Sequence, residues 1–296
     1  MNVIPVVFSF DSRIILGASV SIKSLIDCAK SDTVYDIRIL HSDLSLKLQK
    51  DLNLLVENTR HKMAFHYINH KIFANAPHNN SSWTELVYYR LLIPEVLIGY
   101  DKAIYSDVDV LFKDDLSEVY NKNLDGYEIA AMPFELNDPE TIRHTYFEEN
   151  KNDKIYSSGF LVMNCKRMRE EKTIDKFLKT IDKYKDKLHH FDLDVINITC
   201  NKILPVDSRY CVFQSIFYGN NLEETKEYKY INKIFSQEEI IYAKEKPVII
   251  HYAGNPGKPW RMKTPYADYK EYIDKLPKVL RKYTFRDIRK RFFSKV

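Results

Sequence analysis

The chain alternates between two patterns of apolar and polar residues. Short runs rich in branched apolar residues predict strands over residues 2–9, 35–41, 63–68, 102–106, 128–132, 159–164 and 247–251. Stretches with apolar residues at helical spacing predict helices, the third ended by Pro94, over residues 15–29, 45–58, 84–92 and 168–187. Because strands and helices alternate, we expect an α/β fold with a mostly parallel central sheet flanked by helices.

Side chains able to do chemistry follow three of the predicted strands. Asp11 comes after the first strand, Asp107 and Asp109 follow the fourth, and His251 ends the last. In open α/β sheets, ligands bind beyond the carboxyl ends of the strands, so we expect these residues to share one site. The polar segment 134–157 is expected to form a loop or lid beside it.

Composition narrows the ways in which this site can bind phosphate. Of the 296 residues, 45% are apolar and 29% are charged, which excludes a mainly disordered or collagen-like chain. The length is enough for a full hydrophobic core and predicts one large domain or two small ones. Only seven residues are Gly, and neither GxxxxGK[ST] nor GxGxxG occurs. Phosphate is therefore expected to be bound by a metal ion or by basic side chains.

The net charge of +4 is unevenly distributed. Residues 278–296 contain eight Lys or Arg and one acid, a net +7, so the remaining residues carry −3. The cysteines lack CxxC or metal-ligand spacing, which favours reduced thiols in a cytosolic protein, at positions Cys28, Cys165, Cys200 and Cys211. The N-terminus lacks signal-peptide features, and no apolar stretch approaches the ~20 residues that a membrane span needs.

Two carboxylates one residue apart follow an apolar strand in the sequence YSDVDV. In an extended chain, Asp107 and Asp109 point to the same face, where they repel each other unless a cation lies between them. Mg²⁺ and Mn²⁺ take such oxygen ligands and often bridge them to phosphates. The motif is short, so a pair of solvated acids in a turn remains the alternative interpretation.

The sequence HYAGNPGKPW at residues 251–260 is more specific. His251 ends a strand as a potential third metal ligand, and Lys258 offers a point charge for phosphate. The alternative is a tight surface turn with a packed Trp260.

Together these segments resemble glycosyltransferase family 8, a family of retaining enzymes with the GT-A type nucleotide-diphospho-sugar transferase fold. The resemblance runs from about residue 3 to about residue 260 and rests on VVFSFDSRIILGASVSIKSL, YYRLLIPEVLIGYDKAIYSDVDVLFKDDLSEVY, FDLDVIN and HYAGNPGKPW. It implies a GT-A catalytic domain, which we expect over residues 1–262. It also implies a hexosyltransferase that uses a UDP-sugar donor, with UDP-glucose and UDP-galactose favoured, and Mn²⁺ or Mg²⁺. From their own composition, residues 263–296 are expected to form a basic C-terminal helical tail.

The resemblance also implies roles for single residues. Asp107, Asp109 and His251 would hold the metal, Lys258 would contact the diphosphate, and Gly254 would let the backbone approach it. Arg90 would contact the donor sugar and phosphate, although a helix-surface salt bridge is its alternative role. Asp192 would face the donor sugar, although it could also cap the helix that follows it. The expected nucleotide-sugar site is completed by Ser9 and Asp11 near the uracil and by Arg13, Val108, Ser157 and Ser158.

The sugar half of the site departs from the family pattern. The family segment DQD reads Asp192-Leu193-Asp194 here, so Leu193 replaces an amide expected on the reactive face of the sugar. Ser157 stands where the family often has Asn, and a family Asp falls near Phe134 or Glu135. We therefore expect either a different donor sugar or acids such as Asp192 and Glu135 in that role. Because no strong nucleophile stands out, front-face transfer with retention is favoured over a covalent intermediate.

The C-terminal segment 278–296 interleaves basic and aromatic residues, which is typical of segments that lie on anionic membrane surfaces. The leading hypothesis is a metal-dependent glycosyltransferase, acting on a glycan or glycolipid acceptor of the lipopolysaccharide, lipooligosaccharide or capsule type. It would be cytoplasmic and peripheral at the inner face of a bacterial cytoplasmic membrane. The alternatives are a catalytically weak nucleotide-sugar-binding protein and a basic-tailed nucleic-acid-binding protein. The acidic body offers no second basic face, so nucleic acid is not expected as a partner.

Overall fold

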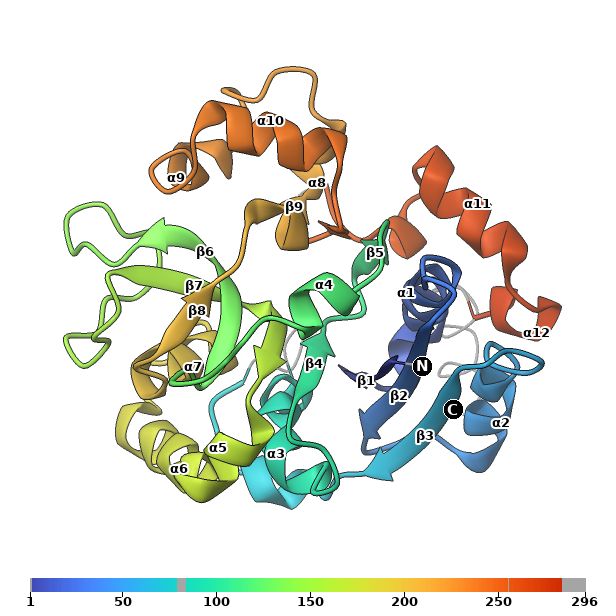
Figure 1. Ribbon diagram of the computed structural model, residues 1–296, viewed down its shortest axis with the longest axis horizontal. Coiled ribbons are helices and arrows are strands. Elements are labelled where there is room, and N and C mark those ends of the chain that lie inside the picture. The colour runs from blue at the N-terminus through green and yellow to red at the C-terminus, as the bar shows by residue number, and fades with distance from the viewer. Residues whose placement is uncertain (1, 79–83, 255, 284–296) are drawn as a thin grey trace, which may run out of the picture.

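A computed structural model describes residues 2–78, 84–254 and 256–283 and is built around a seven-stranded sheet (Figure 1). The strand order is β3-β2-β1-β4-β7-β6-β8. β7 is antiparallel to its neighbours β4 and β6, and the other pairs in this sheet are parallel. The strands are β1 (Asn2–Ser9), β2 (Thr33–His41), β3 (Lys62–Tyr67), β4 (Ala103–Ser106), β6 (Ile129–Leu136), β7 (Lys154–Met163) and β8 (Ile203–Pro205).

Both faces of the sheet are buried. Successive residues of a strand point to opposite sides of the sheet, so neighbouring residues belong to different cores. On β1, Ile4, Val6 and Phe8 belong to one core cluster, whereas Val7 belongs to a second cluster on the other face. All four side chains are fully buried. The sheet is thus the middle layer of three, as the apolar first strand predicts.

Helices cover each face. The first core cluster contains residues of α1 (Ile15–Asp27), α2 (Leu46–Asn53), α4 (Ser117–Tyr120), α11 (Ala267–Lys275) and α12 (Lys278–Arg281). The second contains residues of the 3-10 helices η2 (His70–Phe73) and η3 (Glu85–Leu92) and of α3 (Ile93–Val96), α5 (Cys165–Glu170), α6 (Thr173–Tyr184) and α7 (Asp192–Thr199). Three further 3-10 turns are η1 (Ser12–Ile14), η4 (Ser208–Cys211) and η5 (Pro259–Arg261).

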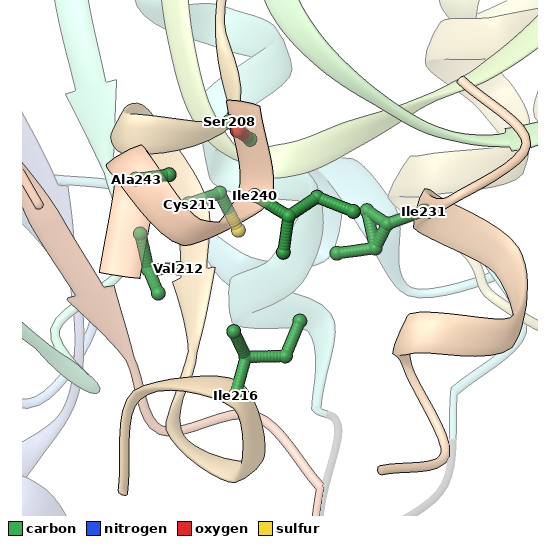
Figure 2. Close-up of a pocket in the computed structure, with 7 residues that line it drawn as sticks. All are labelled: Ser208, Cys211, Val212, Ile216, Ile231, Ile240 and Ala243. Carbon is green, nitrogen blue, oxygen red and sulfur yellow. The ribbon is translucent and has the colours of Figure 1, made fainter. Parts of the chain in front are cut away.

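A second, smaller sheet has the order β5-β10-β9, with β5 (Val110–Phe112), β9 (Val212–Phe213) and β10 (Ile249–His251). Beside it lie three short helices, at the top of Figure 1: α8 (Gln214–Tyr218), α9 (Tyr228–Ile231) and α10 (Gln237–Glu245). Together with η4 and β9 they border a small pocket of about 10 Å³ (Figure 2), lined by Ser208, Cys211, Val212, Ile216, Ile231, Ile240 and Ala243. A pocket of this size is at the lower limit of the room that one water molecule needs.

Three expectations about elements are corrected. His251 lies in the small sheet rather than at the end of a strand of the main one. The helix over 84–92 is a 3-10 helix, and Pro94 lies in the first turn of a short α-helix that begins at Ile93. The helix over 168–187 is divided into α5 and α6. The segment 134–157 is mostly loop, as expected: residues 137–153 form the loop of the β6–β7 hairpin, and only its two ends belong to the strands.

The C-terminal helices contact the body of the molecule. α11 packs on α1, and α12 packs on both α1 and α2, so the red helices lie beside the blue ones in Figure 1. Leu276 and Leu280 are buried in the first core cluster. Residues on both sides of position 262 therefore share one core cluster, and residues 284–296 of the expected tail lie outside the described residues. Among the described residues, no helix is both long and apolar enough to cross a bilayer.

Candidate active site

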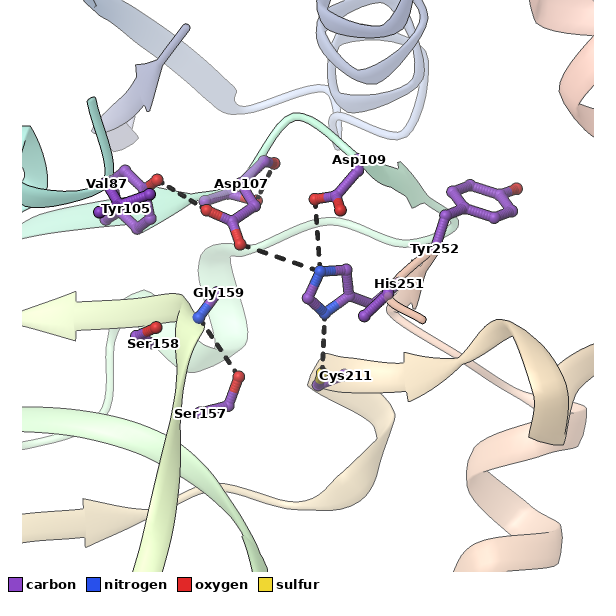
Figure 3. Close-up of polar contacts among 12 residues, drawn as sticks. Val87, Tyr105, Asp107, Asp109, Ser157, Ser158, Gly159, Cys211, His251 and Tyr252 are labelled. Carbon is purple, nitrogen blue, oxygen red and sulfur yellow. Dashed lines mark hydrogen bonds and ion pairs between the residues drawn. The ribbon is translucent and has the colours of Figure 1, made fainter. Parts of the chain in front are cut away.

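Three side chains with metal-binding atoms converge where β4, β5 and β10 meet. The Nε2 atom of His251 lies 3.3 Å from Oδ1 of Asp109 and 3.8 Å from Oδ2 of Asp107. One ligand atom from each residue lies within 4.8 Å of the other two. Figure 3 shows both carboxylates directed toward the imidazole ring. The structure therefore brings together the three residues expected to hold a metal.

Backbone hydrogen bonds fix these residues relative to one another. β10 is antiparallel to β5, with His251 opposite Val110, and the amide of Tyr252 donates to the carbonyl of Asp109 at 2.8 Å. The amide of Asp107 donates to the carbonyl of Gly159 on β7, also at 2.8 Å. The β4–β5 turn is thus held from both sides, because each strand end is paired with a different neighbour.

The absence of a side chain at Gly159 leaves space between His251 and Asp107. A Cβ atom on this residue would lie 2.8 Å from Cε1 of His251 and 2.9 Å from Oδ2 of Asp107, so any other residue would fill the space between the ligands. Two carboxylates and an imidazole form a donor set that suits Mn²⁺ and also Mg²⁺ with additional oxygen ligands. These residues therefore fit a divalent cation, which would supply positive charge next to a substrate diphosphate.

Lys258 lies at the same site. Its Nζ forms an ion pair with Asp109 and donates to the carbonyl of Tyr252 at 2.9 Å. Burial opposes ionisation of Asp109, but the nearby Lys258 and His251 outweigh it and hold the pKa of this carboxyl well below its usual value. Gly254 has a φ of +72°, a conformation that glycine adopts without strain, and so allows the chain to turn between His251 and Lys258.

Arg90 connects Asp107 with Asp192. Its NH2 donates to Oδ1 of Asp107 at 2.9 Å, and its NH1 lies 3.1 Å from Oδ2 of Asp192. The same NH1 donates to the carbonyl of Ser158 at 2.6 Å, and the guanidinium stacks over the ring of Tyr105. Arg90 is buried, so the alternative of a helix-surface salt bridge is excluded.

Asp192 is a buried carboxylate with one strong countercharge. Burial raises its pKa to about 6, although Arg90 favours the charged form. It is the first residue of α7, and Phe191 holds the cap position, so Asp192 does not cap this helix. Leu193 is half-buried and packs against the first core cluster. A buried acid of raised pKa close to a metal site is a common feature of functional sites.

The residues expected near the uracil lie at the end of β1. Val7 is opposite Tyr105 in the parallel β1–β4 pair, which places Ser9 at the same edge of the sheet as Asp107. Ser9 donates to the carbonyl of Leu86 at 3.1 Å. Asp11 caps η1, accepts from the amide of Arg13 at 2.8 Å and forms an ion pair with its guanidinium. Val108, between Asp107 and Asp109, is buried in the first core cluster.

The remaining residues of the expected sugar site come from the β6–β7 hairpin. Ser158 contacts Arg90 through its carbonyl, and Ser157 accepts from the amide of Gly159 at 3.3 Å. The carboxylate of Glu135 accepts hydrogen bonds from the amide of Arg143 and from His144, both in the hairpin loop. Burial disfavours its charge, but these partners outweigh it and lower its pKa. The catalytic role of Glu135 stays a prediction.

Comparison with known proteins identifies the family. The model of the family described as Glycosyl transferase family 8 matches residues 5–264. The chain belongs to this family. The match confirms the resemblance seen in the sequence and the expected enzyme class of hexosyltransferase.

Two curated relatives cover most of this family 8 glycosyltransferase. Glycosyltransferase GlyF of Streptococcus pneumoniae is 23% identical over 262 residues, covering 86% of this chain and 56% of the relative. Lipopolysaccharide 1,2-glucosyltransferase of Escherichia coli K12 is 24% identical over 202 residues, covering 64% and 53%. The chain thus spans about half the length of these two relatives.

A solved structure shows the same fold. The galactosyltransferase LgtC, in complex with donor and acceptor sugar analogs, superposes with a TM-score of 0.74 at 21% identity, covering 95% of this chain and 100% of that chain. A likeness at this identity concerns the fold alone, and it confirms the expected GT-A type.

Three residues of this family 8 enzyme take part in the site without having been expected there. The hydroxyl of Tyr105 donates to Oδ1 of Asp107 at 2.7 Å, and it could have been found because it stands two positions earlier on the same strand face. Gly159 leaves space for an ion between His251 and Asp107. In the sequence, only the rarity of glycine in this chain draws attention to this position. Cys211 contacts His251, and nothing in the sequence links two residues 40 positions apart.

Proposed function

We propose that this chain transfers a hexose from a UDP-sugar to a hydroxyl of a glycan or glycolipid acceptor, with retention of configuration and with a divalent metal ion. The observation that carries the proposal is the convergence of Asp107, Asp109 and His251 beside Lys258. Family membership and the sugar analogs bound to LgtC support a nucleotide-sugar donor and a glycan acceptor.

Different residues have different roles in the proposed reaction. Asp107, Asp109 and His251 would hold Mn²⁺ or Mg²⁺, which supplies positive charge next to the diphosphate. Lys258 leaves its ion pair with Asp109 for a phosphate oxygen and offsets the negative charge that builds up on departing UDP.

The sugar side of the site supports transfer on one face. Asp192, positioned by Arg90, faces the sugar as it develops oxocarbenium character. Leu193 offers no nucleophile, so the acceptor hydroxyl attacks from the face that UDP leaves. The hairpin loop 137–153 covers the donor and keeps water from intercepting it.

Calorimetric titration of UDP-sugars with and without Mn²⁺ tests this function. We expect binding that strengthens with Mn²⁺, followed by UDP release in a screen of UDP-glucose, UDP-galactose, UDP-GlcNAc and UDP-GalNAc. Asp109→Asn should abolish the Mn²⁺ effect, whereas the matched variant Asp101→Asn, at the exposed opposite end of β4, should retain it. Absence of nucleotide binding in both titrations would contradict the proposal.

A catalytically weak nucleotide-sugar-binding protein is the second candidate. It is favoured by Leu193, which packs into apolar surroundings where the family pattern has an amide. Mn²⁺-dependent binding without transfer or hydrolysis of any donor would support it. Measurable transfer that Asp109→Asn abolishes would exclude it.

The proposed acceptor and location rest on the tail and on the relatives. An acceptor of the lipopolysaccharide, lipooligosaccharide or capsule type is consistent with the name of the E. coli relative. α12 presents exposed Lys278, Arg281 and Lys282 while Leu280 is buried. This arrangement suits a cytoplasmic enzyme that associates with the inner face of a bacterial cytoplasmic membrane through residues 278–296.

A further inference from the structure

Both ring nitrogens of His251 have partners. Nε2 faces the carboxylates of Asp107 and Asp109, and Nδ1 lies 3.3 Å from Sγ of Cys211. Figure 3 shows the ring between these groups, with the carboxylates on one side and Cys211 on the other. The imidazole is buried, and Cys211 is only 2% exposed. The orientation of the His251 ring is therefore set by protein contacts rather than by solvent.

The second sheet places Cys211 at this nitrogen. Cys211 is the last residue of η4 and directly precedes β9, which is parallel to β10. Phe213 is opposite His251 in this pairing, and the two rings are stacked, with centroids 6.2 Å apart and planes 16° apart. Stacking against Phe213 restrains the plane of the imidazole, and the contact with Cys211 selects which nitrogen points toward the carboxylates.

The chemistry of an imidazole ligand makes this contact relevant. A histidine that binds a metal through Nε2 keeps its proton on Nδ1, and that proton needs an acceptor. Metal-bound histidines almost always donate this proton to a carboxylate, a carbonyl or water, and loss of such partners lowers metal affinity by about 10–100-fold. Here the acceptor is a thiol sulfur, which accepts hydrogen bonds weakly but can do so in a buried site.

We propose that Cys211 is a positioning residue of the metal site, whose sulfur accepts the Nδ1 proton of His251 and keeps Nε2 directed toward Asp107 and Asp109. The inference rests on the proposed function, because it concerns the affinity for the metal of the donor site. Cys211 itself touches neither the metal nor the substrate.

Packing is the alternative role for Cys211, because the residue lines the small pocket shown in Figure 2 together with apolar side chains such as Val212 and Ile216. If packing were its only role, the loss of its sulfur would reduce stability without a specific effect on metal binding. Cys165 is a matched control, since it is also a buried thiol, and its sulfur contacts the carbonyl of Met163 on β7 at 3.7 Å.

The test is a calorimetric titration of Mn²⁺ in the presence of UDP. We expect about 10–100-fold weaker Mn²⁺ binding for Cys211→Ala and for Cys211→Val, which fills the space without an acceptor. Cys211→Ser retains an acceptor and should restore binding to within about threefold of the wild type. Cys165→Ala should bind Mn²⁺ like the wild type, although it loses a similar amount of stability.

The outcomes separate the two proposals. Wild-type binding of Mn²⁺ by folded Cys211→Ala or Cys211→Val would overturn the positioning role and leave the proposed function intact. Equal weakening in Cys211→Ser and Cys211→Val would also overturn the role, because the hydroxyl would then offer no rescue. If Cys211→Ala does not fold, the comparison of Cys211→Val with Cys211→Ser gives the same decision. No Mn²⁺-dependent UDP binding by the wild type would overturn the proposed function itself.

Discussion

At the scale of single residues, Arg90 provides the positive charge that two carboxylates of the site share. Its guanidinium lies between Asp107 and Asp192, two carboxylates that come from β4 and α7. Removing one partner of a buried ion pair costs more than the pair contributes, because the remaining charge loses its compensation. Here a single substitution removes a countercharge from two carboxylates at once, so Arg90 couples Asp107 to Asp192.

Arg90→Met is therefore expected to lower the free energy of unfolding by about 3 kcal/mol, measured by urea denaturation of the metal-free protein. Adding Asp192→Asn should recover about 1 kcal/mol, because it removes one of the two uncompensated charges. Arg167→Met is the control, since Arg167 forms a partly exposed pair with Glu171 and should cost about 0.5 kcal/mol. If the effects of Arg90→Met and Asp192→Asn on the free energy of unfolding were additive, the two residues would not be coupled.

Asp192 predicts a pH dependence of stability. Burial raises its pKa to about 6 in the folded chain, above its ordinary value of about 4. The folded state therefore binds more protons between these values, so stability falls as pH rises through this window. Compared with Asp192→Asn, the wild type should lose roughly 2–3 kcal/mol more between about pH 4 and about pH 7. Parallel stability curves of the two proteins, measured by denaturation of the metal-free forms, would contradict this expectation.

At the scale of elements, β7 forms one side of the metal site through Gly159. Gly159→Ala should weaken Mn²⁺ binding at least tenfold, because the new Cβ would meet His251 and Asp107 at 2.8 and 2.9 Å. Gly99→Ala is the control, since a Cβ there meets no atom within 4 Å and should leave binding unchanged. Calorimetry with Mn²⁺ and UDP measures both. Equal binding by the two variants would mean that the space beside Gly159 does not serve the ion.

The break between α5 and α6 shows why some elements were not predictable. Residues 168–187 contain no Gly or Pro, and their apolar residues recur at helical spacing, so the local pattern favours one long helix. The structure instead turns at Lys172, whose φ of 51° is left-handed and strained for a residue with a side chain. The turn allows Phe177 and Ile181 to pack into the second core cluster. This is a tertiary constraint that local sequence does not carry.

Relief of this strain provides a stability test. Lys172 is exposed, and Gly adopts the left-handed conformation without a Cβ clash. Lys172→Gly should therefore raise the free energy of unfolding by about 1 kcal/mol, which corresponds to about 2–4 °C in melting temperature. Lys185→Gly, at a right-handed position that follows α6, should instead lower stability by about 0.5–1 kcal/mol. A decrease for Lys172→Gly would show that its side-chain contacts outweigh the strain.

At the scale of the whole molecule, the site joins two sheets that the sequence pattern could not separate. Asp107, Asp109 and His251 were expected together because each follows an apolar strand, and this expectation holds although His251 belongs to the small sheet. The contact of Cys211 with His251 depends on the β9–β10 pairing. Short strands of two and three residues leave too weak a pattern to predict such a pairing, so the environment of the ligands emerges only from the fold.

Two truncations test how the C-terminal part contributes. A variant ending at residue 264 lacks α11 and α12, which bury Tyr269, Leu276 and Leu280 in the first core cluster. Each buried side chain contributes about 2 kcal/mol, so this variant should unfold at a much lower temperature or fail to fold. It also loses the hydrogen bond from Tyr218 to Asp268 and, with it, a support of the residues next to His251.

A variant ending at residue 283 keeps these contacts and loses five of the eight basic residues of the tail. It should melt like the full chain and bind UDP with Mn²⁺ normally, but bind anionic vesicles much more weakly, since each basic residue near the surface adds about 1 kcal/mol. Neutral vesicles are the control in a co-sedimentation assay. Retained binding to anionic vesicles would contradict a membrane role for residues 284–296. Wild-type melting of the variant ending at residue 264 would instead make residues 263–296 an independent unit, against the shared core.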